Sequence, residues 1–525
     1  MSRRFVAVYL FLAAFTDVLF AFETTSSGNE WSRKRLTALD SYERHDYAGA
    51  EKLDREALDL AGGGDTERVA ISLTDLGLTL RAEGKYAEAS AAFARALGIR
   101  ERILPPTSPQ LAVAYNNVAA LDHLLGNYAD AEIMYRKAIA IWRDTSDPTA
   151  VSAMNNLASL MTSMGRYSEA EAAYRNSVET ARRFGDSAAR PMAQALAGLG
   201  EVLIRRDRPV EAEEMIRSGL EMRSNLFGPQ SREVGISLAV LGHLYLQDGR
   251  LEDAETSLRK AYAICEATAA ASHPECLGTV GNLAIVLRRR GNMREAEQWY
   301  ERSLTLIEDK LGPNHPSLAA ALNNYGEFLI SVGNLKPAVP MLERARDIWQ
   351  SQLGADNPNF ASALTNLGTA YFKMKRWNAA EPLFAQALAI HSKTAGPDSI
   401  AVAGDLQNLG AIYFATKRYR EAQDTLERAM RIESGAPADS YPLLSLATGN
   451  LAELYRVEKR YADAAPLFER AISIQERTGE SQDPRLAALL RDYAQVMRAL
   501  ERFAEAEKAE ARATGIQVRN ILNLR

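Results

Sequence analysis

The chain has 525 residues, of which 47% are hydrophobic and 25% charged, and this composition excludes disorder along its whole length. Its 62 Lys and Arg against 67 Asp and Glu give a net charge of −5, so the basic excess that favours nucleic-acid binding is missing. Two cysteines are too few for a disulfide scaffold or a cysteine-based zinc cluster.

The N-terminus is typical of an export signal. Basic residues precede an uncharged apolar run at 5–15, and Asp17 ends this run before it reaches the roughly 20 residues that cross a bilayer. We predict that residues 1–21 are a signal peptide, or alternatively an uncleaved N-terminal anchor, and that residues 22–42 are a leader segment. The protein is then expected to be bacterial and periplasmic or secreted, or else anchored to the inner membrane.

From residue 43 to residue 525 the sequence repeats with a period of about 42 residues. An alanine lies five residues after the start of each of twelve short turns, and a small residue lies seven residues after that alanine. A large apolar residue lies between them in ten repeats. The turns start at His45, Gly84, Gly126, Gly165, Asp207, Gly249, Gly291, Gly333, Lys375, Lys417, Lys459 and Glu501.

These spacings predict a helix after each turn. Steps of four and three residues place the three positions on one helical face, where small residues let two helix axes approach closely. The half-repeat before each turn is also helical in pattern, and a proline 17 residues before the turn marks its start in seven repeats. These are Pro109, Pro148, Pro274, Pro316, Pro358, Pro442 and Pro484.

Two helices in every repeat, without hairpin-like alternation, predict an all-α fold. We expect an α-solenoid of about twelve antiparallel helix pairs. The first and last repeats carry Asp54 and Glu510 in place of the large apolar residue. We interpret them as capping repeats, in which no neighbour covers that face.

The turn sequences GKYAEA at 84–89, GNYADA at 126–131 and GRYSEA at 165–170 resemble tetratricopeptide repeats (TPRs). The 42-residue period and the segment LGPNHPSLAAALNN at 311–324 resemble the kinesin-light-chain-like subclass of that family. The resemblance extends over nearly everything after residue 42. It implies a right-handed superhelix whose first helices line a concave groove, where peptide segments or partner proteins bind and no reaction is catalysed.

The resemblance also implies a row of groove asparagines that bind the main chain of a ligand. A side-chain amide offers both donors and an acceptor, so it can pair with a peptide group of any sequence. The alternative is that these amides bond between neighbouring repeats and stabilise the fold. Gly198 and Val240 interrupt the row. The matching positions are Asn117, Asn156, Asn282, Asn324, Asn366, Asn408 and Asn450.

One helical turn further along, the same face carries basic residues. Guanidinium and ammonium groups there would attract an acidic segment or a carboxylate, and the alternative for each is a solvated helix end. The residues are Arg205, Arg288, Arg289, Lys373, Arg456 and Arg498.

The sequence lacks the usual nucleotide-binding, metalloprotease and serine-hydrolase motifs. We therefore predict a non-enzymatic protein–protein interaction scaffold with a protein or peptide partner, without cofactor, metal or nucleic acid. The alternatives are a self-assembling structural protein of the cell envelope and a cytosolic TPR regulator. Cys265 and Cys276 flank one helix junction, where they would pair in an oxidising periplasm or remain two buried thiols.

Overall fold

A computed structural model describes residues 29–522 except residues 45, 146, 207, 268–273, 436–440 and 478–483. The predicted signal peptide therefore lies outside the described residues. The described residues form α-helices, one short 3₁₀ helix at Gly185–Ala188, and no β-strand. None of these helices combines the length and the apolar character of a segment that crosses a membrane.

The helices alternate as first and second members of antiparallel pairs. The first helices are α1 (Glu30–Glu43), α3 (Glu67–Ala82), α5 (Pro109–Leu125), α7 (Thr149–Ser163), α9 (Ala189–Arg205), α11 (Arg232–Gln247), α13 (Pro274–Arg289), α15 (Pro316–Ser331), α17 (Pro358–Lys373), α19 (Ile400–Ala415), α21 (Tyr441–Val457) and α23 (Pro484–Ala499). The second helices are α2 (Tyr47–Ala61), α4 (Tyr86–Ile103), α6 (Tyr128–Thr145), α8 (Tyr167–Phe184), α10 (Pro209–Phe227), α12 (Leu251–Ala267), α14 (Met293–Leu311), α16 (Leu335–Leu353), α18 (Trp377–Thr394), α20 (Tyr419–Ser434), α22 (Tyr461–Arg477) and α24 (Phe503–Leu522).

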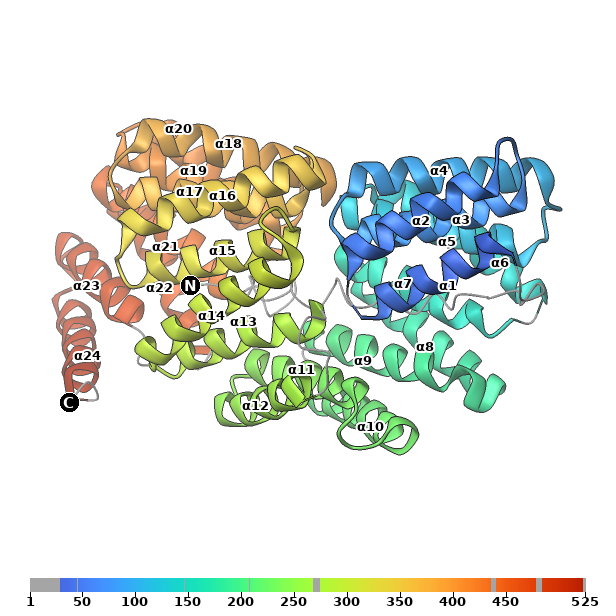
Figure 1. Cartoon of the computed structure of the whole chain (residues 1–525). Coiled ribbons are helices and arrows are strands. Elements are labelled where there is room, and N and C mark those ends of the chain that lie inside the picture. The colour runs from blue at the N-terminus through green and yellow to red at the C-terminus, as the bar shows by residue number, and fades with distance from the viewer. Residues whose placement is uncertain are drawn as a thin grey trace. The chain divides into compact units, whose positions relative to one another are not determined.

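The helix pairs stack in chain order. In pairs such as α3 with α4 and α19 with α20, the two helices pack along each other, and α4 and α20 then pack on the first helix of the following pair (Figure 1). The predicted all-α solenoid is therefore confirmed. The chain divides into two compact units: the N-terminal unit ends at Ala363, and the C-terminal unit begins at Leu364.

The turn between the two helices of a pair has a left-handed residue at its start. The backbone φ angle is positive at ten of the twelve predicted turn starts, and the other two lie outside the described residues. At Gly84, with φ of 77°, the following amide of Lys85 donates to the carbonyl of Leu80 over 2.8 Å. This hydrogen bond closes the end of the first helix. Lys375, Lys417 and Lys459 have φ of 59–62°, so the turn also accepts lysine.

The predicted prolines lie at or next to helix starts. A proline has a fixed φ and no N–H to satisfy, which suits the first turn of a helix. Pro109, Pro274, Pro316, Pro358 and Pro484 are the first residues of their helices, whereas Pro148 precedes α7 and Pro442 is the second residue of α21.

Ion pairs join the second helices of successive repeats. A glutamate six residues after one turn start contacts the arginine that directly follows the next turn start. Glu213 lies 2.6 Å from Arg250, whose guanidinium stacks over the Tyr245 ring at 4.2 Å. Such half-exposed pairs contribute at most about 1 kcal/mol each, so they support the spacing of the repeats more than their stability. The same arrangement recurs at Glu132–Arg166 and Glu381–Arg418.

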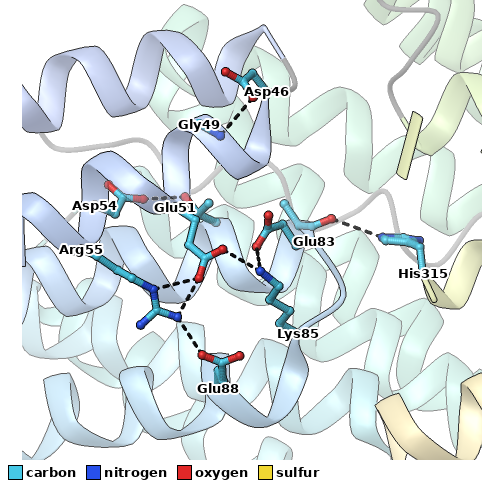
Figure 2. Close-up of polar contacts among 11 residues, drawn as sticks. Asp46, Gly49, Glu51, Asp54, Arg55, Glu83, Lys85, Glu88 and His315 are labelled. Carbon is cyan, nitrogen blue, oxygen red and sulfur yellow. Dashed lines mark hydrogen bonds and ion pairs between the residues drawn. The ribbon is translucent and has the colours of Figure 1, made fainter. Parts of the chain in front are cut away.

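Part of the predicted leader segment belongs to the solenoid. Residues Glu30–Glu43 form α1, which packs against α2 as the first helix of the first pair. Asp54 of α2 is therefore only 3% exposed, and the interpretation of its face as uncovered is wrong. The Thr79 hydroxyl donates to the Asp54 carboxyl over 2.7 Å (Figure 2). At the other end, the Glu510 side chain is 43% exposed and pairs with Arg498.

Replacing Asp54 with asparagine is expected to stabilise the first repeat at pH 8 by about 1–3 kcal/mol and to change little at pH 4–5. Burial raises the pKa of Asp54 to about 7 and so favours its protonated form in the fold. The stability that the protonated Asp54 carboxyl contributes is fully present below the ordinary carboxyl pKa of about 4 and is lost as the pH rises through 7. Hydrogen exchange of α1 and α2 at the two pH values measures the effect.

The matched control for this change is Asp59→Asn on the same helix, because Asp59 is exposed. This control is expected to leave the pH dependence of hydrogen exchange in α1 and α2 as it is in the parent chain. Equal exchange of parent and Asp54→Asn at both pH values would show that the Asp54 carboxyl is not held protonated.

Cys265 is 2% exposed near the end of α12 and is disulfide-bonded, which contradicts the alternative of two buried thiols. The only other cysteine in the sequence is Cys276.

Candidate functional site

The seven predicted asparagines occupy one position of the repeat. Each lies nine residues before a turn start, on the first helix of its pair. The first helices of neighbouring repeats contact each other, as α5 does with α7, α13 with α15, and α19 with α21. Because equal positions on parallel neighbouring helices share a face, the asparagines form a row within each unit. We call these seven residues the asparagine row.

The two units differ in how far the row is exposed. In the N-terminal unit, Asn117 and Asn282 are 1% exposed and Asn324 is 5% exposed. In the C-terminal unit, Asn408 and Asn450 are half-buried. The amide position is thus enclosed throughout the N-terminal unit and becomes partly accessible only at the last two asparagines of the C-terminal unit. Asn156 of the N-terminal unit and Asn366, the first member in the C-terminal unit, are each 5% exposed.

Three buried amides of the row have polar atoms without a hydrogen-bond partner. They are both amide atoms of Asn117, Oδ1 of Asn282 and Nδ2 of Asn324. A buried polar atom without a partner costs about 1–3 kcal/mol, so such positions are normally filled by apolar residues. Apolar or small residues do occur at the equivalent positions Gly198 and Val240.

The alternative role, hydrogen bonding between repeats, applies to Asn156. Its Nδ2 donates to Oδ1 of Asn116 on the neighbouring first helix over 3.2 Å. The adjacent residue Asn155 donates to the carbonyl of Pro191 over 2.8 Å, again between repeats. Asparagine thus bonds between repeats at some positions of these helices, whereas atoms of Asn117, Asn282 and Asn324 have no partner.

The predicted basic residues of the same face are largely engaged with neighbouring groups. Arg288 Nη1 lies 3.2 Å from Glu327 Oε1 on the next first helix. Arg456 pairs with Glu453 on its own helix and donates to Gln495 over 2.8 Å. An acidic ligand would have to compete with these carboxylates. Of the others, Arg289 donates to the backbone carbonyl of Leu246, and Lys373 is exposed.

Sequence reasoning missed further residues on this face, one turn after the asparagine position. Glu201, His243 and Glu327 lie six residues before their turn starts. Their side chains differ in type, so no recurrent residue marks the position. Burial and, to a smaller extent, the charge of Arg205 lower the pKa of His243 to about 3, so this histidine is neutral at physiological pH. Among the described residues, no group of His, Cys, Asp and Glu is arranged to bind a metal ion.

The row ends in acidic residues at both termini of the solenoid. Asp75 and Asp492 occupy the asparagine position in the second and the last repeat. Asp75 forms an ion pair with Arg35 of α1 at 2.5 Å, although burial still raises the pKa of Asp75. Burial likewise raises the pKa of Asp492. The amides are therefore confined to the middle of the chain.

Comparison with known proteins agrees with this architecture. The family model described as tetratricopeptide repeat matches residues 38–102, 78–144, 110–183, 191–267, 276–351, 317–385, 359–432 and 443–517. No curated protein is significantly similar to the chain in sequence.

Two solved structures illustrate the similarity, and the second of them is described by its kinesin light chain repeats. BtubC (BKLC) from P. vanneervenii is 21% identical with a TM-score of 0.39, over 43% of this chain and 91% of that one. A kinesin light chain of Podosopora anserina with nearly identical TPR-like repeats is 23% identical with a TM-score of 0.34, over 39% of this chain and 98% of that one.

Proposed function

Because the chain belongs to the tetratricopeptide repeat family, we propose that it is a protein–protein interaction scaffold that binds extended peptide segments along its asparagine row. The observation that carries this proposal is the set of buried amide atoms without partners in Asn117, Asn282 and Asn324. A peptide main chain offers one donor and one acceptor per residue, which is what such amides require.

Binding of this kind recognises an extended main chain more than a particular side chain. Each amide–peptide hydrogen bond contributes about 0.5–1.5 kcal/mol net, so useful affinity needs several asparagines acting together. The row supplies them at one per repeat. In the C-terminal unit, Asn408 and Asn450 are half-buried, so a peptide reaches them without displacing a helix.

The triple substitution Asn366→Ala, Asn408→Ala and Asn450→Ala is expected to weaken peptide binding at least tenfold, whatever the peptide sequence. Three lost hydrogen bonds of about 0.5–1.5 kcal/mol each give this minimum. The probe is a set of fluorescein-labelled 12-residue peptides selected on the full chain from a phage-displayed random library. Fluorescence anisotropy measures the dissociation constant of each.

The matched control replaces three exposed asparagines, Asn292, Asn334 and Asn378, with alanine, and should leave the affinities unchanged. Circular dichroism establishes that both triple variants remain folded. Equal affinity of the folded row variant and the parent would rule out the C-terminal part of the row, Asn366, Asn408 and Asn450, as the peptide-binding element, and failure to select any peptide would count against the proposed function.

A further inference from the structure

Two hydrogen bonds join parts of the N-terminal unit that are 233 residues apart in the sequence. His315, which precedes α15, lies with Nε2 3.2 Å from the carbonyl oxygen of Ala82, the last residue of α3 (Figure 2). Asn357, which precedes α17, donates from Nδ2 to the carbonyl of Leu124 near the end of α5 over 3.1 Å. Each bond therefore connects the start of one first helix to the end of another, six repeats earlier.

The turn glycines confirm that these parts are in close contact. A Cβ atom added to Gly84 would lie 2.7 Å from Cδ of Pro316, and one added to Gly126 would lie 3.2 Å from Cδ of Pro358. At the other turn glycines of this unit a Cβ would meet nothing within 4 Å; these are Gly165, Gly249, Gly291 and Gly333. Two consecutive turns are thus covered, by equivalent prolines of two consecutive repeats.

His315 and Asn357 each make two bonds with different ring or amide atoms. His315 Nδ1 accepts the amide N–H of Ser317, so Nε2 carries the proton and donates to Ala82. Asn357 Oδ1 accepts the N–H of Asn359, which leaves Nδ2 for Leu124. Each residue caps its own helix and also bonds to a distant one. Ser231 and Ser399 occupy the same repeat position, and their hydroxyls cap their own helices.

The helices joined in this way carry enclosed members of the asparagine row. Helix α15 is buried at every residue from Pro316 to Gly326, which includes Asn324. Helix α5 carries Asn117, which is 1% exposed. Helices α19 and α21 of the C-terminal unit hold Asn408 and Asn450 only half-buried.

We propose that the contacts of His315 with Ala82 and of Asn357 with Leu124 form a latch that closes the N-terminal unit over its part of the asparagine row. A peptide then reaches Asn117 and Asn324 only after the latch opens, whereas the half-buried Asn408 and Asn450 of the C-terminal unit are accessible without this step. The inference rests on the proposed function and adds that access of the peptide to the N-terminal part of the row is regulated. The peptide itself supplies the partners that the enclosed amides lack.

The first test opens the latch by removing its donors. In the full chain, Asn117→Cys reports exposure of the row through its rate of labelling by N-ethylmaleimide, followed by intact mass, with the parent chain as the blank. The double change His315→Ser and Asn357→Ser keeps the helix caps, because serine caps α11 and α19 at this position, but is too short to reach Ala82 or Leu124. Labelling is expected to become at least tenfold faster.

A second variant opens the latch without changing its residues. Gly84→Lys and Gly126→Lys place side chains against Pro316 and Pro358, and lysine is accepted because Lys375, Lys417 and Lys459 occupy the same turn position. The matched control is Gly165→Lys with Gly249→Lys, where the side chains meet open space. The first pair is expected to accelerate labelling at least tenfold, and the control pair is expected to leave the rate unchanged.

Faster labelling in the serine variant and in the first lysine pair, but not in the control pair, supports the latch. Unchanged labelling in both opened variants, with helical content retained in circular dichroism, overturns it. Equal acceleration in the control pair also overturns it, because the effect would then come from general loosening of the turns. No peptide takes part in this assay, so failure of the latch and failure of peptide binding appear in separate experiments.

Discussion

Replacing Trp142 with alanine is expected to destabilise the repeats around α6 by about 3–5 kcal/mol, the usual cost of deleting a buried aromatic side chain. Trp142 is 2% exposed and packs with Leu111 and Ala112 of α5 and with Ala150 and Ala153 of α7. It therefore connects one repeat to the next, and its loss weakens the repeat and the junction together.

Native-state hydrogen exchange of α5, α6 and α7 is the appropriate measurement for this variant, because stacked repeats open locally and a single global transition cannot be assumed. Faster exchange is expected in these helices first. The matched control is Trp299→Ala on α14, where the indole is half-exposed and makes an edge contact with Tyr262 at 5.2 Å. This control is expected to cost only about 1 kcal/mol. Similar costs for the two tryptophans would show that Trp142 does not connect the repeats.

The repeat register was predictable because the residues that set it recur. The residue at the turn start needs a left-handed backbone, and the alanine five residues later, such as Ala254, is fully buried in its helix pair. Neither position tolerates much variation, so each recurs in phase and marks the pair. The first helix α1 was missed because its aromatic Trp31 and its ion-pairing Arg35 follow no repeat pattern.

A second class of core residue was not predictable. The position 16 residues after the turn start is buried at Trp142, Arg223 and Glu433 and half-buried at His391, so its residue type changes from repeat to repeat. Each polar member has its own partner on a first helix. Arg223 donates to Ser237 over 2.9 Å, His391 lies 2.6 Å from Asp405, and Gln407 donates to Glu433 over 2.5 Å. Each contact between helices thus has a residue pair of its own. Because these pairs do not recur along the chain, the repeat pattern does not reveal them.

The candidate site likewise has one feature that the sequence predicts and one that it does not. The positions of the asparagine row followed from the period, because every member lies at one point of the repeat. The burial of the row in the N-terminal unit could not be predicted from the period. This burial accompanies contacts between residues that are 233 positions apart, such as His315 with Ala82. The sequence marks His315 only as a residue before a helix-starting proline. Its second bond depends on how far the stack of repeats curves, which no single repeat encodes.

Replacing Gly242 with leucine is expected to destabilise its helix pair by about 3 kcal/mol, at the upper end of the usual cost of overpacking. A Cβ at Gly242 of α11 would lie 2.6 Å from Cγ of Leu258 and 3.2 Å from the carbonyl oxygen of Ala254, both on α12. Leu258 is fully buried and has room for only a small shift, so the three carbons that leucine adds beyond Cβ have to separate the two helices.

Two further variants distinguish crowding from other effects of the Gly242 substitution. Gly242→Ala is expected to be nearly neutral, because six repeats already carry alanine at this position and the gain in helix propensity of about 1 kcal/mol offsets a small shift of Leu258. Gly98→Leu on α4 is expected to stabilise by about 0.5–1 kcal/mol, since a Cβ there meets only Nη1 of Arg102 at 3.7 Å. Hydrogen exchange of α11 and α12 compares the Gly242 variants, and exchange of α4 reports on Gly98→Leu. If Gly242→Leu exchanges as slowly as the parent chain, the close approach of the two helices is not what maintains the pair, and the recurrence of glycine or alanine at this position needs another cause.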